Sequence, residues 1–423
     1  MSRIVFTTLG SLGDLYPQIA LAIELRRRGH DIVFAVMQEY GEIVAGLGFE
    51  FWLMRPDSSM MKNPETLALM KDTKTGPEYG FKHWLAPSLR DTYTDLLASA
   101  KDADLIVAGA AVFVAPLVAE KLTIPWIAFA LAPYGFFSIT DPSVTLLKFL
   151  DKLRELGRPL QARMIPLVKG LTQHLAMPIY QLRVELGLAQ ISHNPLEEEF
   201  SSCMILGSFS PVLGAPQPDW DPRIVVTGFI FYDGTEQNNE LSAELQAFLA
   251  AGEPPIVFTL GTIVVGVPGT FYQESIRAAT LLNRRAVLLI GANTPPTNLP
   301  ESIIATDYVR HSLIFPHACA IVHQGGSGTT AQALKSGHPT LIVPYCDDQP
   351  DNAARIERLG TSRTISRQEY TAPRVARELE EILENPKYAT KVAEVALIIQ
   401  AEDGVTFACD TIVAQLAKPN LYS

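Results

Sequence analysis

Residues 320–330 read Ala-Ile-Val-His-Gln-Gly-Gly-Ser-Gly-Thr-Thr and carry the clearest fold signal in the chain. Ala320–His323 is an apolar run typical of a buried strand, and Thr329–Ser336 has the composition of a helix. The glycines between them leave backbone N–H groups free at the positive end of that helix, which is a ready anion site. The loop lacks both the Gly-Lys-Ser/Thr ending of a Walker A loop and the GxGxxG spacing. The alternative, a glycine turn needed only for tight packing, leaves His323 and the hydroxyls of the loop unexplained.

The rest of the chain repeats this alternation of short apolar runs and helical patterns, which is typical of parallel α/β sheets. Seven further strands are expected in two groups, which a strand-like run at Ile224–Tyr232 separates: Ile4–Leu9, Asp31–Val36, Leu105–Ala108, Trp126–Ala130, Pro255–Leu260, Ala286–Ile290 and Pro339–Pro344. We therefore expect an α/β protein with two Rossmann-like domains.

A chain of 423 residues exceeds one ordinary core, so two domains of roughly 200 residues each are expected. The turn-rich stretch Gly214–Pro222 and the polar stretch Asp233–Asn239 place the boundary between them. We assign residues 1–225 and 226–400 to the two domains. Residues 401–423 are expected to form a helix that packs back towards the first domain.

Gly10–Pro17 follows the first strand and reads Gly-Ser-Leu-Gly-Asp-Leu-Tyr-Pro. Because proline suits the first turn of a helix, we expect a helix that starts at Tyr16–Pro17 and stops at Gly29. The basic run Arg26–Arg28 complements the carboxyl end of its dipole. Asp14 would then lie in a glycine-rich turn, either as a helix cap or as a functional carboxylate at the edge of the sheet.

The acidic composition argues against a nucleic-acid binder, since the net charge is −11 and the pI is about 5.3. Residues 145–183 run basic, as a solvated helix face or as a weak attraction to an anionic lipid surface. The four cysteines show no metal-ligand spacing and no disulfide framework, and no apolar run is long enough to span a bilayer. With no signal-peptide layout at the start, we expect a cytoplasmic protein.

Pro344–Asn352 also follows an expected strand, at the edge where ligands bind in open α/β sheets. Asp348 and Gln349 supply the mixture of acceptors and donors that sugar hydroxyls require. Taken alone, the pair could cap the helix that follows. Next to a phosphate site, a sugar-phosphate ligand is the better interpretation.

Three motifs in this order resemble the family 1 inverting glycosyltransferases of GT-B fold: Gly-Ser-x-Gly-Asp-x-x-Pro around Asp14, His-x-Gly-Gly-x-Gly-Thr-Thr from His323, and Asp-Gln-x-x-Asn-Ala from Asp348. The resemblance covers nearly the whole chain. Within the family, the chain most resembles the rhamnolipid rhamnosyltransferases, which Thr227–Phe229 with Asp233-Gly234 and Val257–Thr262 also suggest, the sterol glucosyltransferases and the antibiotic glycosyltransferases.

The resemblance implies that the first domain binds the acceptor, the second binds a nucleotide sugar, and catalysis takes place in the cleft between them. Asp14 would be the general base. The leaving diphosphate would be held by the glycine loop and the helix end, with no metal and no cofactor, because the nucleotide sugar is a co-substrate. The implied donor-binding residues are Gly261, Thr262, Tyr308, Val309, His323, Gln324, Gly325, Gly326, Ser327, Gly328, Thr329, Asp348 and Gln349.

The chain departs from the family pattern on the donor side. The phosphate-contacting histidine of the plant enzymes aligns with Gln324, so either His323 substitutes for it or the contact passes to the amide and to backbone N–H groups. The ribose-binding glutamate falls at Gln332, and the base-stacking tryptophan is Tyr308, which is followed by Arg310-His311. We therefore expect a UDP- or dTDP-linked sugar as the donor, with the choice between the two left open by the sequence.

Methionine and aromatic side chains are plentiful where this family forms its acceptor pocket, and they suit a pliable pocket for an apolar molecule. For any single one, a place in the ordinary core is the stronger expectation. As acceptor-binding residues we name Ser11, Leu12, Phe81, Trp84, Phe136 and Phe137. The Asp102-Ala103-Asp104 triplet resembles a metal-binding DxD motif but lies in the wrong domain, so we expect a solvated loop there.

The sequence thus predicts a metal-independent inverting glycosyltransferase that moves a hexose or 6-deoxyhexose to the hydroxyl of a lipophilic small molecule or lipid. Two alternatives remain. A sugar-nucleotide epimerase of the same architecture would turn over the donor with no acceptor present. A non-catalytic nucleotide-sugar-binding subunit would bind the donor and transfer to nothing.

Overall fold

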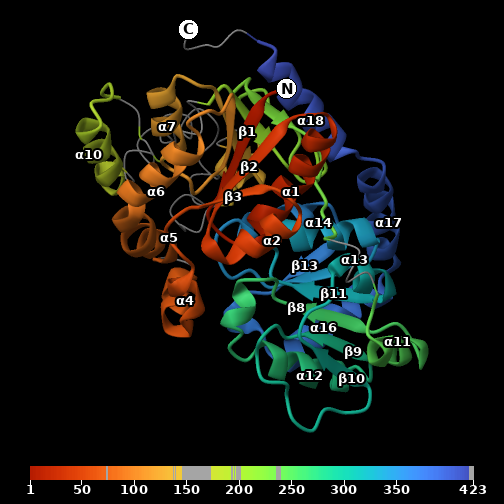
Figure 1. Ribbon diagram of the computed structural model, residues 1–423. Helices are drawn as coiled ribbons and strands as arrows, with labels where there is room; N and C mark the ends of the chain where they lie inside the picture. The colour runs from red at the N-terminus through yellow and green to blue at the C-terminus, as the bar shows by residue number, and fades with distance from the viewer. Residues whose placement is uncertain are drawn as a thin grey trace.

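The computed structural model describes residues 1–72, 75–136, 138, 140–144, 173–191, 194, 196, 202–234 and 240–418. Two parallel sheets lie one above the other, with the amino-terminal sheet at the top of Figure 1 and the carboxy-terminal sheet below it. Most of the basic stretch 145–183, which was predicted as a solvated face or a lipid contact, lies outside the described residues.

The amino-terminal sheet has the strand order β3-β2-β1-β4-β5-β6-β7. All four strands predicted in this half are confirmed to within one residue, whereas β3 and β6 were not foreseen and β7 takes up only the start of the run at Ile224. The bounds are β1 Arg3–Thr8, β2 Asp31–Val36, β3 Glu50–Leu53, β4 Leu105–Gly109, β5 Trp126–Ala130, β6 Met204–Gly207 and β7 Ile224–Val226.

The carboxy-terminal sheet has the order β10-β9-β8-β11-β12-β13 and is also parallel throughout the described pairs. The predicted strands are present, and two short strands, β10 and β13, extend the edges. The bounds are β8 Ile256–Thr259, β9 Ala286–Leu289, β10 Ile303–Thr306, β11 Ala320–His323, β12 Thr340–Ile342 and β13 Ser362–Thr364. Its central strands are fully buried, as expected for a sheet covered by helices on both faces.

The helices connect successive strands and cover both sheets (Figure 1). Those of the amino-terminal half are α1 Leu12–Arg27, α2 Gly41–Gly46, α3 Ser59–Lys62, α4 Pro64–Met70, α5 Gly76–Gly80, α6 Ala86–Ser99, α7 Ala115–Leu122 and α10 Met177–Glu185. Those of the carboxy-terminal half are α11 Ala243–Ala250, α12 Phe271–Leu281, α13 His311–Ile314, α14 Ser327–Ser336, α15 Gln349–Arg358, α16 Ala372–Glu384, α17 Pro386–Gln400 and α18 Gly404–Leu416. Within the described residues, no helix combines the length and the apolar character needed to cross a membrane.

The start of α1 differs from the prediction, since the helix begins at Leu12 rather than at Tyr16–Pro17. Ser11 is the N-cap, and Asp14, three residues on, closes a capping box by accepting the backbone N–H of Ser11. Pro17 therefore lies inside the helix rather than at its first turn. The predicted end is confirmed, because Arg28 is the C-cap and Gly29 adopts a left-handed φ of 90°.

The carboxy-terminal helix α18 contacts α1 of the amino-terminal domain, and Figure 1 shows it beside the amino terminus. Arg28, which ends α1, forms a 2.5 Å ion pair with Asp410 of α18. One apolar core includes residues of the first sheet together with Ala408, Cys409 and Ile412 of α18. The last helix therefore packs one face against the core of the amino-terminal domain.

Candidate active site

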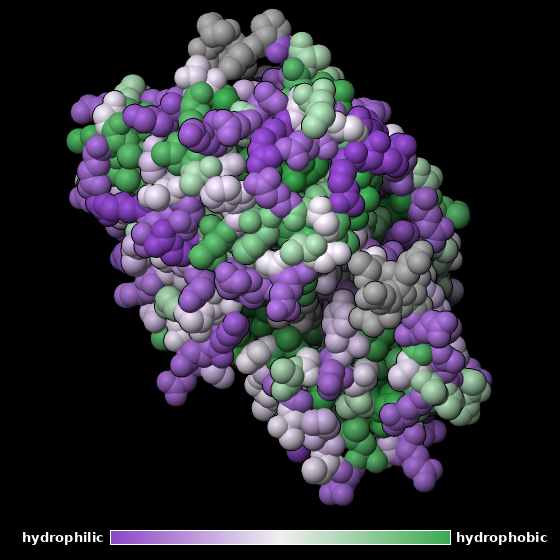
Figure 2. All heavy atoms as spheres, in the orientation of Figure 1, coloured by the Kyte–Doolittle hydropathy of each residue, from purple (hydrophilic) through white to green (hydrophobic). Residues whose placement is uncertain are grey.

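Each sheet has a point where the strand order reverses, and ligands of open α/β sheets bind there, beyond the carboxyl ends of the strands. In the amino-terminal sheet this point lies between β1 and β4, and Gly10–Asp14 follows β1. In the carboxy-terminal sheet it lies between β8 and β11, and the Gly261 turn and the glycine loop of residues 324–328 follow these strands. The surface of the molecule is hollowed between the two domains (Figure 2).

One of the two carboxylate oxygens of Asp14 is hydrogen-bonded within its own helix cap. Oδ2 accepts hydrogen bonds from the Ser11 backbone N–H at 2.7 Å and from the Ser11 hydroxyl at 2.9 Å. Oδ1 has no hydrogen-bond partner among the described residues, and Asp14 as a whole is half-buried. Burial raises the pKa of Asp14, and it outweighs the opposing effects of the Ser11 bonds and of Lys71. The two predicted roles of Asp14, helix cap and functional carboxylate, are therefore compatible. Oδ2 caps α1, and Oδ1 is available to accept a hydrogen bond or a proton.

The glycine loop leads directly into α14, which begins at Ser327, two residues earlier than predicted. The N–H groups of Ser327, Gly328 and Thr329 precede the first intrahelical acceptor pair, in which the Thr330 N–H bonds to Gly326. Gly325 has a φ of 90°, and a side chain there would meet Ile342. A Cβ on Gly328, by contrast, would meet nothing within 4 Å. The loop therefore presents free donors and an open surface at the positive end of α14.

His323 and Gln324 take different places in this loop. His323 is fully buried, and its Nδ1 accepts the Gly325 N–H at 3.0 Å, which leaves the proton on Nε2. Burial lowers the pKa of His323 to about 3, so the ring is neutral. The Nε2 of Gln324 lies so close to Gly261 that a Cβ there would be 2.2 Å away. Gln324 thus reaches into the space between the Leu-Gly-Thr turn and the glycine loop, while His323 supports the loop from below.

Asp348 is the N-cap residue of α15, but its side chain does not cap that helix. Its Oδ2 accepts hydrogen bonds from the Ser327 hydroxyl at 2.6 Å and from the Asn352 amide at 2.7 Å. The capping interpretation of this side chain is therefore wrong. Burial raises the pKa of Asp348 to about 6, and the nearby charges of Asp347 and Asp14 add to the effect.

Gln349 lies differently from the prediction that it holds sugar hydroxyls. It is 6% exposed, and its Oε1 accepts the backbone N–H groups of Tyr345 at 2.8 Å and Cys346 at 3.2 Å. Its carboxamide oxygen therefore shapes the turn that carries Asp347 and Asp348. The Gln349 oxygen is thus used within its own turn. Of the two residues, Asp348 is therefore the better candidate for binding a sugar hydroxyl in this conformation.

The remaining predicted donor residues lie on the same edge of the carboxy-terminal domain. Thr262 is exposed and Val309 is half-buried, while Tyr308 is 59% exposed, which leaves its ring free to stack. The Tyr308 hydroxyl interacts with Tyr16 of α1. A contact between the tyrosine hydroxyls thus joins α1 to the segment that follows β10.

The predicted acceptor residues differ in exposure. Ser11 and Leu12 are half-buried at the start of α1, whereas Phe81 and Trp84 are buried and the Trp84 indole N–H bonds to the Asp57 carbonyl. Phe136 is 1% exposed and packs edge-on against Trp220. The prediction that Phe136 binds acceptor is therefore corrected to a place in the core. Phe137 lies outside the described residues.

Two other charged features lie away from these loops. Asp102 is exposed in the turn before β4, and Asp104 accepts the backbone N–H of Arg3 at 2.8 Å, so the triplet forms a solvated turn as predicted. A cavity of about 560 Å³ in the carboxy-terminal domain is lined only by side chains of β13 and α16: Arg363, Arg374, Arg377, Glu378, Glu380, Glu381 and Glu384. No predicted site residue lines it.

Comparisons with known proteins show which enzymes this chain is similar to. Residues 4–135 match the family model of the glycosyltransferase family 28 N-terminal domain, and residues 277–410 match that of the erythromycin biosynthesis protein CIII-like C-terminal domain. The chain is 28% identical over 429 residues to O-mycaminosyltylonolide 6-deoxyallosyltransferase of Streptomyces fradiae, with 96% of each chain covered. This chain is a glycosyltransferase of GT-B fold.

One further sequence relative and one solved structure are named for different acceptors. A sterol 3-beta-glucosyltransferase of Pichia angusta is 27% identical over 430 residues, which span 98% of this chain and 33% of that longer protein. A solved spinosyn rhamnosyltransferase, complexed with thymidine diphosphate, has a TM-score of 0.69 at 18% identity and covers 97% of this chain and 100% of its own.

The glycosyltransferase also brings residues to the site that the sequence analysis did not assign. Asn352, the fifth residue of the Asp-Gln-x-x-Asn motif, donates to Asp348 and to the Gly325 carbonyl, and the motif itself was the signal for it. Tyr134, beyond β5, has its pKa raised by burial and by the nearby charges of Asp347, Asp351 and Asp348. Lys71 had no signal in the sequence, because its partner is 276 residues away.

Proposed function

We propose that this glycosyltransferase transfers a hexose or 6-deoxyhexose from a dTDP- or UDP-linked sugar to a hydroxyl group of a lipophilic acceptor, with inversion. The observation that carries the proposal is the meeting of two loops from the two switch points. Oδ1 of Asp14 in the amino-terminal domain accepts no hydrogen bond from the residues that the structure describes, and the charge of Asp14 acts on the pKa of Asp348, beside the amino terminus of α14. A nucleophile and an electrophile held by these loops would meet between the domains.

In the proposed reaction, the acceptor hydroxyl attacks the anomeric carbon while Asp14 takes its proton on Oδ1. The bond between the anomeric carbon and the phosphate oxygen breaks, and the diphosphate leaves with the electron pair. A single displacement of this kind inverts the anomeric centre. Because burial raises the pKa of Asp14 towards the working pH, the carboxylate is a stronger base than an exposed aspartate.

The leaving diphosphate would lie on the N–H groups of Ser327, Gly328 and Thr329, whose donors have no intrahelical acceptor. The Gln324 amide, placed between Gly261 and Gly326, is positioned to donate from the other side. We assign charge stabilisation to these groups, without a metal. Neutral His323 would act through the loop rather than as a cation.

The nucleotide assignment rests on Tyr308 and on the named neighbours. The exposed ring of Tyr308, in the segment between β10 and α13, can stack on a pyrimidine, and the matched spinosyn enzyme was solved with thymidine diphosphate. The acceptor class rests on the sterol and macrolide enzymes among the relatives. We therefore place dTDP-sugars ahead of UDP-sugars and hydroxylated polycyclic or macrocyclic molecules ahead of sugars or peptides.

A two-step experiment tests the proposal. Thermal shifts with dTDP, UDP and GDP identify the nucleotide, because a ligand that binds only the folded state raises Tm. Transfer from the matching glucose and rhamnose donors to a panel of sterols and macrolide aglycones is then followed by mass spectrometry, and NMR gives the anomeric configuration. An inverted product supports the proposal. Donor turnover without acceptor would instead identify an epimerase, and binding without any transfer would identify a non-catalytic subunit.

A further inference from the structure

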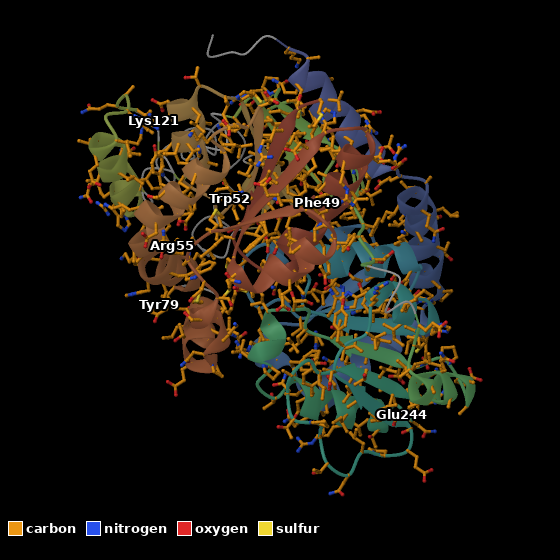
Figure 3. The ribbon with its side chains drawn as sticks, in the orientation of Figure 1. Phe49, Trp52, Arg55, Tyr79, Lys121 and Glu244 are labelled. Carbon is orange, nitrogen blue, oxygen red and sulfur yellow. The ribbon has the colours of Figure 1, made fainter. Side chains whose placement is uncertain are left out.

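The short helix α4 joins the amino-terminal domain to the loops of the carboxy-terminal domain. In Figure 1 it projects downward from the amino-terminal domain, and in Figure 3 Arg55 and Tyr79 lie on the flank above it. Leu67 of α4 is 4% exposed, and a Cβ on Gly266 would lie 2.9 Å from its Cδ2. Close packing therefore brings α4 against the loop that follows β8.

Lys71, the residue after α4, makes the second contact between these parts. Its Nζ lies 2.7 Å from Oδ2 of Asp347, and its side chain is only 14% exposed. Asp347 has a left-handed φ of 55° and stands directly before Asp348. A lysine ammonium is costly to bury without an anion, so Lys71 needs Asp347 as its partner. The ion pair therefore connects the turn of Asp347 and Asp348 to the amino-terminal domain.

The charges around Asp14 come from both domains. On its own helix the partner is Ser11, whereas Lys71 and Asp347 act on Asp14 from outside, and Asp14 in turn acts on Asp348 and on the Tyr40 hydroxyl. Lys71 is the cation in this group. It stands among carboxylates that would repel one another without it.

We propose that Lys71 is a positioning residue for glycosyl transfer, whose ammonium group holds the Asp347–Asp348 turn against the amino-terminal domain and keeps one positive charge beside the Asp14 carboxylate. This inference rests on the proposed function, in which Asp14 is the base. It gives α4 a role in assembling the two halves of the site.

The effects of Lys71 and Asp347 on the pKa of Asp14 distinguish this role from that of an ion pair that only holds the two domains together. Lys71 lowers the pKa of Asp14, whereas Asp347 raises it, although the two residues form one ion pair. Lys71→Met and Asp347→Asn both break the pair, yet they must move the Asp14 titration in opposite directions. A purely structural clasp predicts the same effect from both variants.

The test uses the full chain labelled with carboxyl ¹³C at aspartate, with the Asp14 signal assigned by its loss in Asp14→Asn. We expect the Asp14 titration midpoint to rise in Lys71→Met, to fall in Asp347→Asn, and to stay near wild type in Lys71→Arg. The acid limb of kcat/KM, measured with the donor and acceptor that the substrate panel selects, should move with it. The Tm and the dTDP-induced thermal shift of each variant verify folding.

Each outcome has a separate meaning. If Asp14→Asn is inactive but Lys71→Met and Asp347→Asn shift the midpoint in the same direction or not at all, the inference about Lys71 is wrong and the proposed function stands. If Asp14→Asn keeps wild-type transfer, the assignment of the base is wrong, whatever the two charge variants do.

Discussion

The Ser327 hydroxyl donates a 2.6 Å hydrogen bond to Oδ2 of Asp348, which joins the first residue of α14 to the residue before α15. Asn352 bonds to the same carboxylate oxygen from one turn into α15. The loop proposed for phosphate and the residue proposed for the sugar are thus one hydrogen-bonded unit. A sugar diphosphate spanning them would contact both ends of that unit.

Replacing Asp348 by Asn should stabilise the protein at alkaline pH. The pKa of Asp348 in the folded state is about 6, above the ordinary value of 3.8, so the folded protein binds this proton more tightly than the unfolded chain. The stability that this group contributes is full below pH 4 and is lost as pH rises through about 6. We expect Asp348→Asn to raise Tm relative to wild type at pH 8 and to leave it nearly unchanged at pH 4.

The same variant should lower transfer, on the order of tenfold or more, because Asn cannot offer a charged acceptor to a sugar hydroxyl. Tm by differential scanning calorimetry at the two pH values and kcat/KM at pH 8 measure both effects. If Tm at pH 8 were lower in Asp348→Asn than in wild type, the ionised Asp348 carboxylate would be stabilising the folded protein, which contradicts this prediction.

Two glycine substitutions in the same loop should have different effects, because Gly328→Ala should weaken dTDP binding and Gly325→Ala should lower stability. Gly328 has free space around its Cα, so Gly328→Ala should leave Tm unchanged or slightly higher while weakening dTDP binding about tenfold, since the methyl group would occupy the space of the phosphates. Gly325→Ala, the matched comparison, should cost about 1–3 kcal/mol of stability because of the left-handed φ and the contact with Ile342. Isothermal titration with dTDP and urea unfolding distinguish the two. Unimpaired dTDP binding by Gly328→Ala would place the diphosphate elsewhere.

Tyr308 should be the stacking platform for the nucleobase. Its ring is 59% exposed, so Tyr308→Ala should cost little stability while strongly reducing the dTDP-induced thermal shift, whereas Tyr308→Trp should preserve it. Leu281→Ala, at an exposed apolar position on α12, is the control and should leave the thermal shift unaltered. Equal thermal shifts in wild type and Tyr308→Ala would remove this residue from the nucleotide site.

Phe136 should behave as a core residue. It is fully buried against Phe209 and Trp220, so Phe136→Ala should lower the free energy of unfolding by about 3–5 kcal/mol. The acceptor KM of the folded fraction should remain within twofold of wild type. A large rise in acceptor KM without loss of stability would restore the acceptor role.

The sequence predicts most of the fold because the central strands are short runs of mostly apolar residues, as at Ala320–His323. The short edge strands escape this reasoning: β3 has mostly exposed residues, and β13 contains only Ser362, Arg363 and Thr364. The start of α1 was misplaced because proline was weighted above the Ser11-x-x-Asp14 pattern, whose carboxylate acts as the capping-box partner.

The site is less predictable than the fold, since side-chain direction depends on contacts distant in sequence. Gln349 is adjacent to Asp348, yet its side-chain oxygen Oε1 accepts a hydrogen bond from the backbone N–H of Tyr345 in its own loop. The different directions of His323 and Gln324 could not be read from their adjacency, because all four residues of β11 are buried and the direction of Gln324 shows only in its closeness to Gly261. Lys71 follows a short helix with no motif, and only the docking of α4 on the other domain gives it a partner.

The central claim is that the free oxygen of Asp14 accepts the proton of the acceptor hydroxyl, and Asp14→Asn tests it most directly. Asn preserves the side-chain shape and an acceptor for the Ser11 N–H, so α1 should remain intact. Asp102→Asn, in an exposed turn, is the matched control. Transfer and the dTDP-induced thermal shift are measured side by side on the three proteins. We predict that Asp14→Asn loses transfer by about 10²–10⁴-fold while keeping the thermal shift of wild type and of the control. Wild-type transfer by Asp14→Asn would contradict the account.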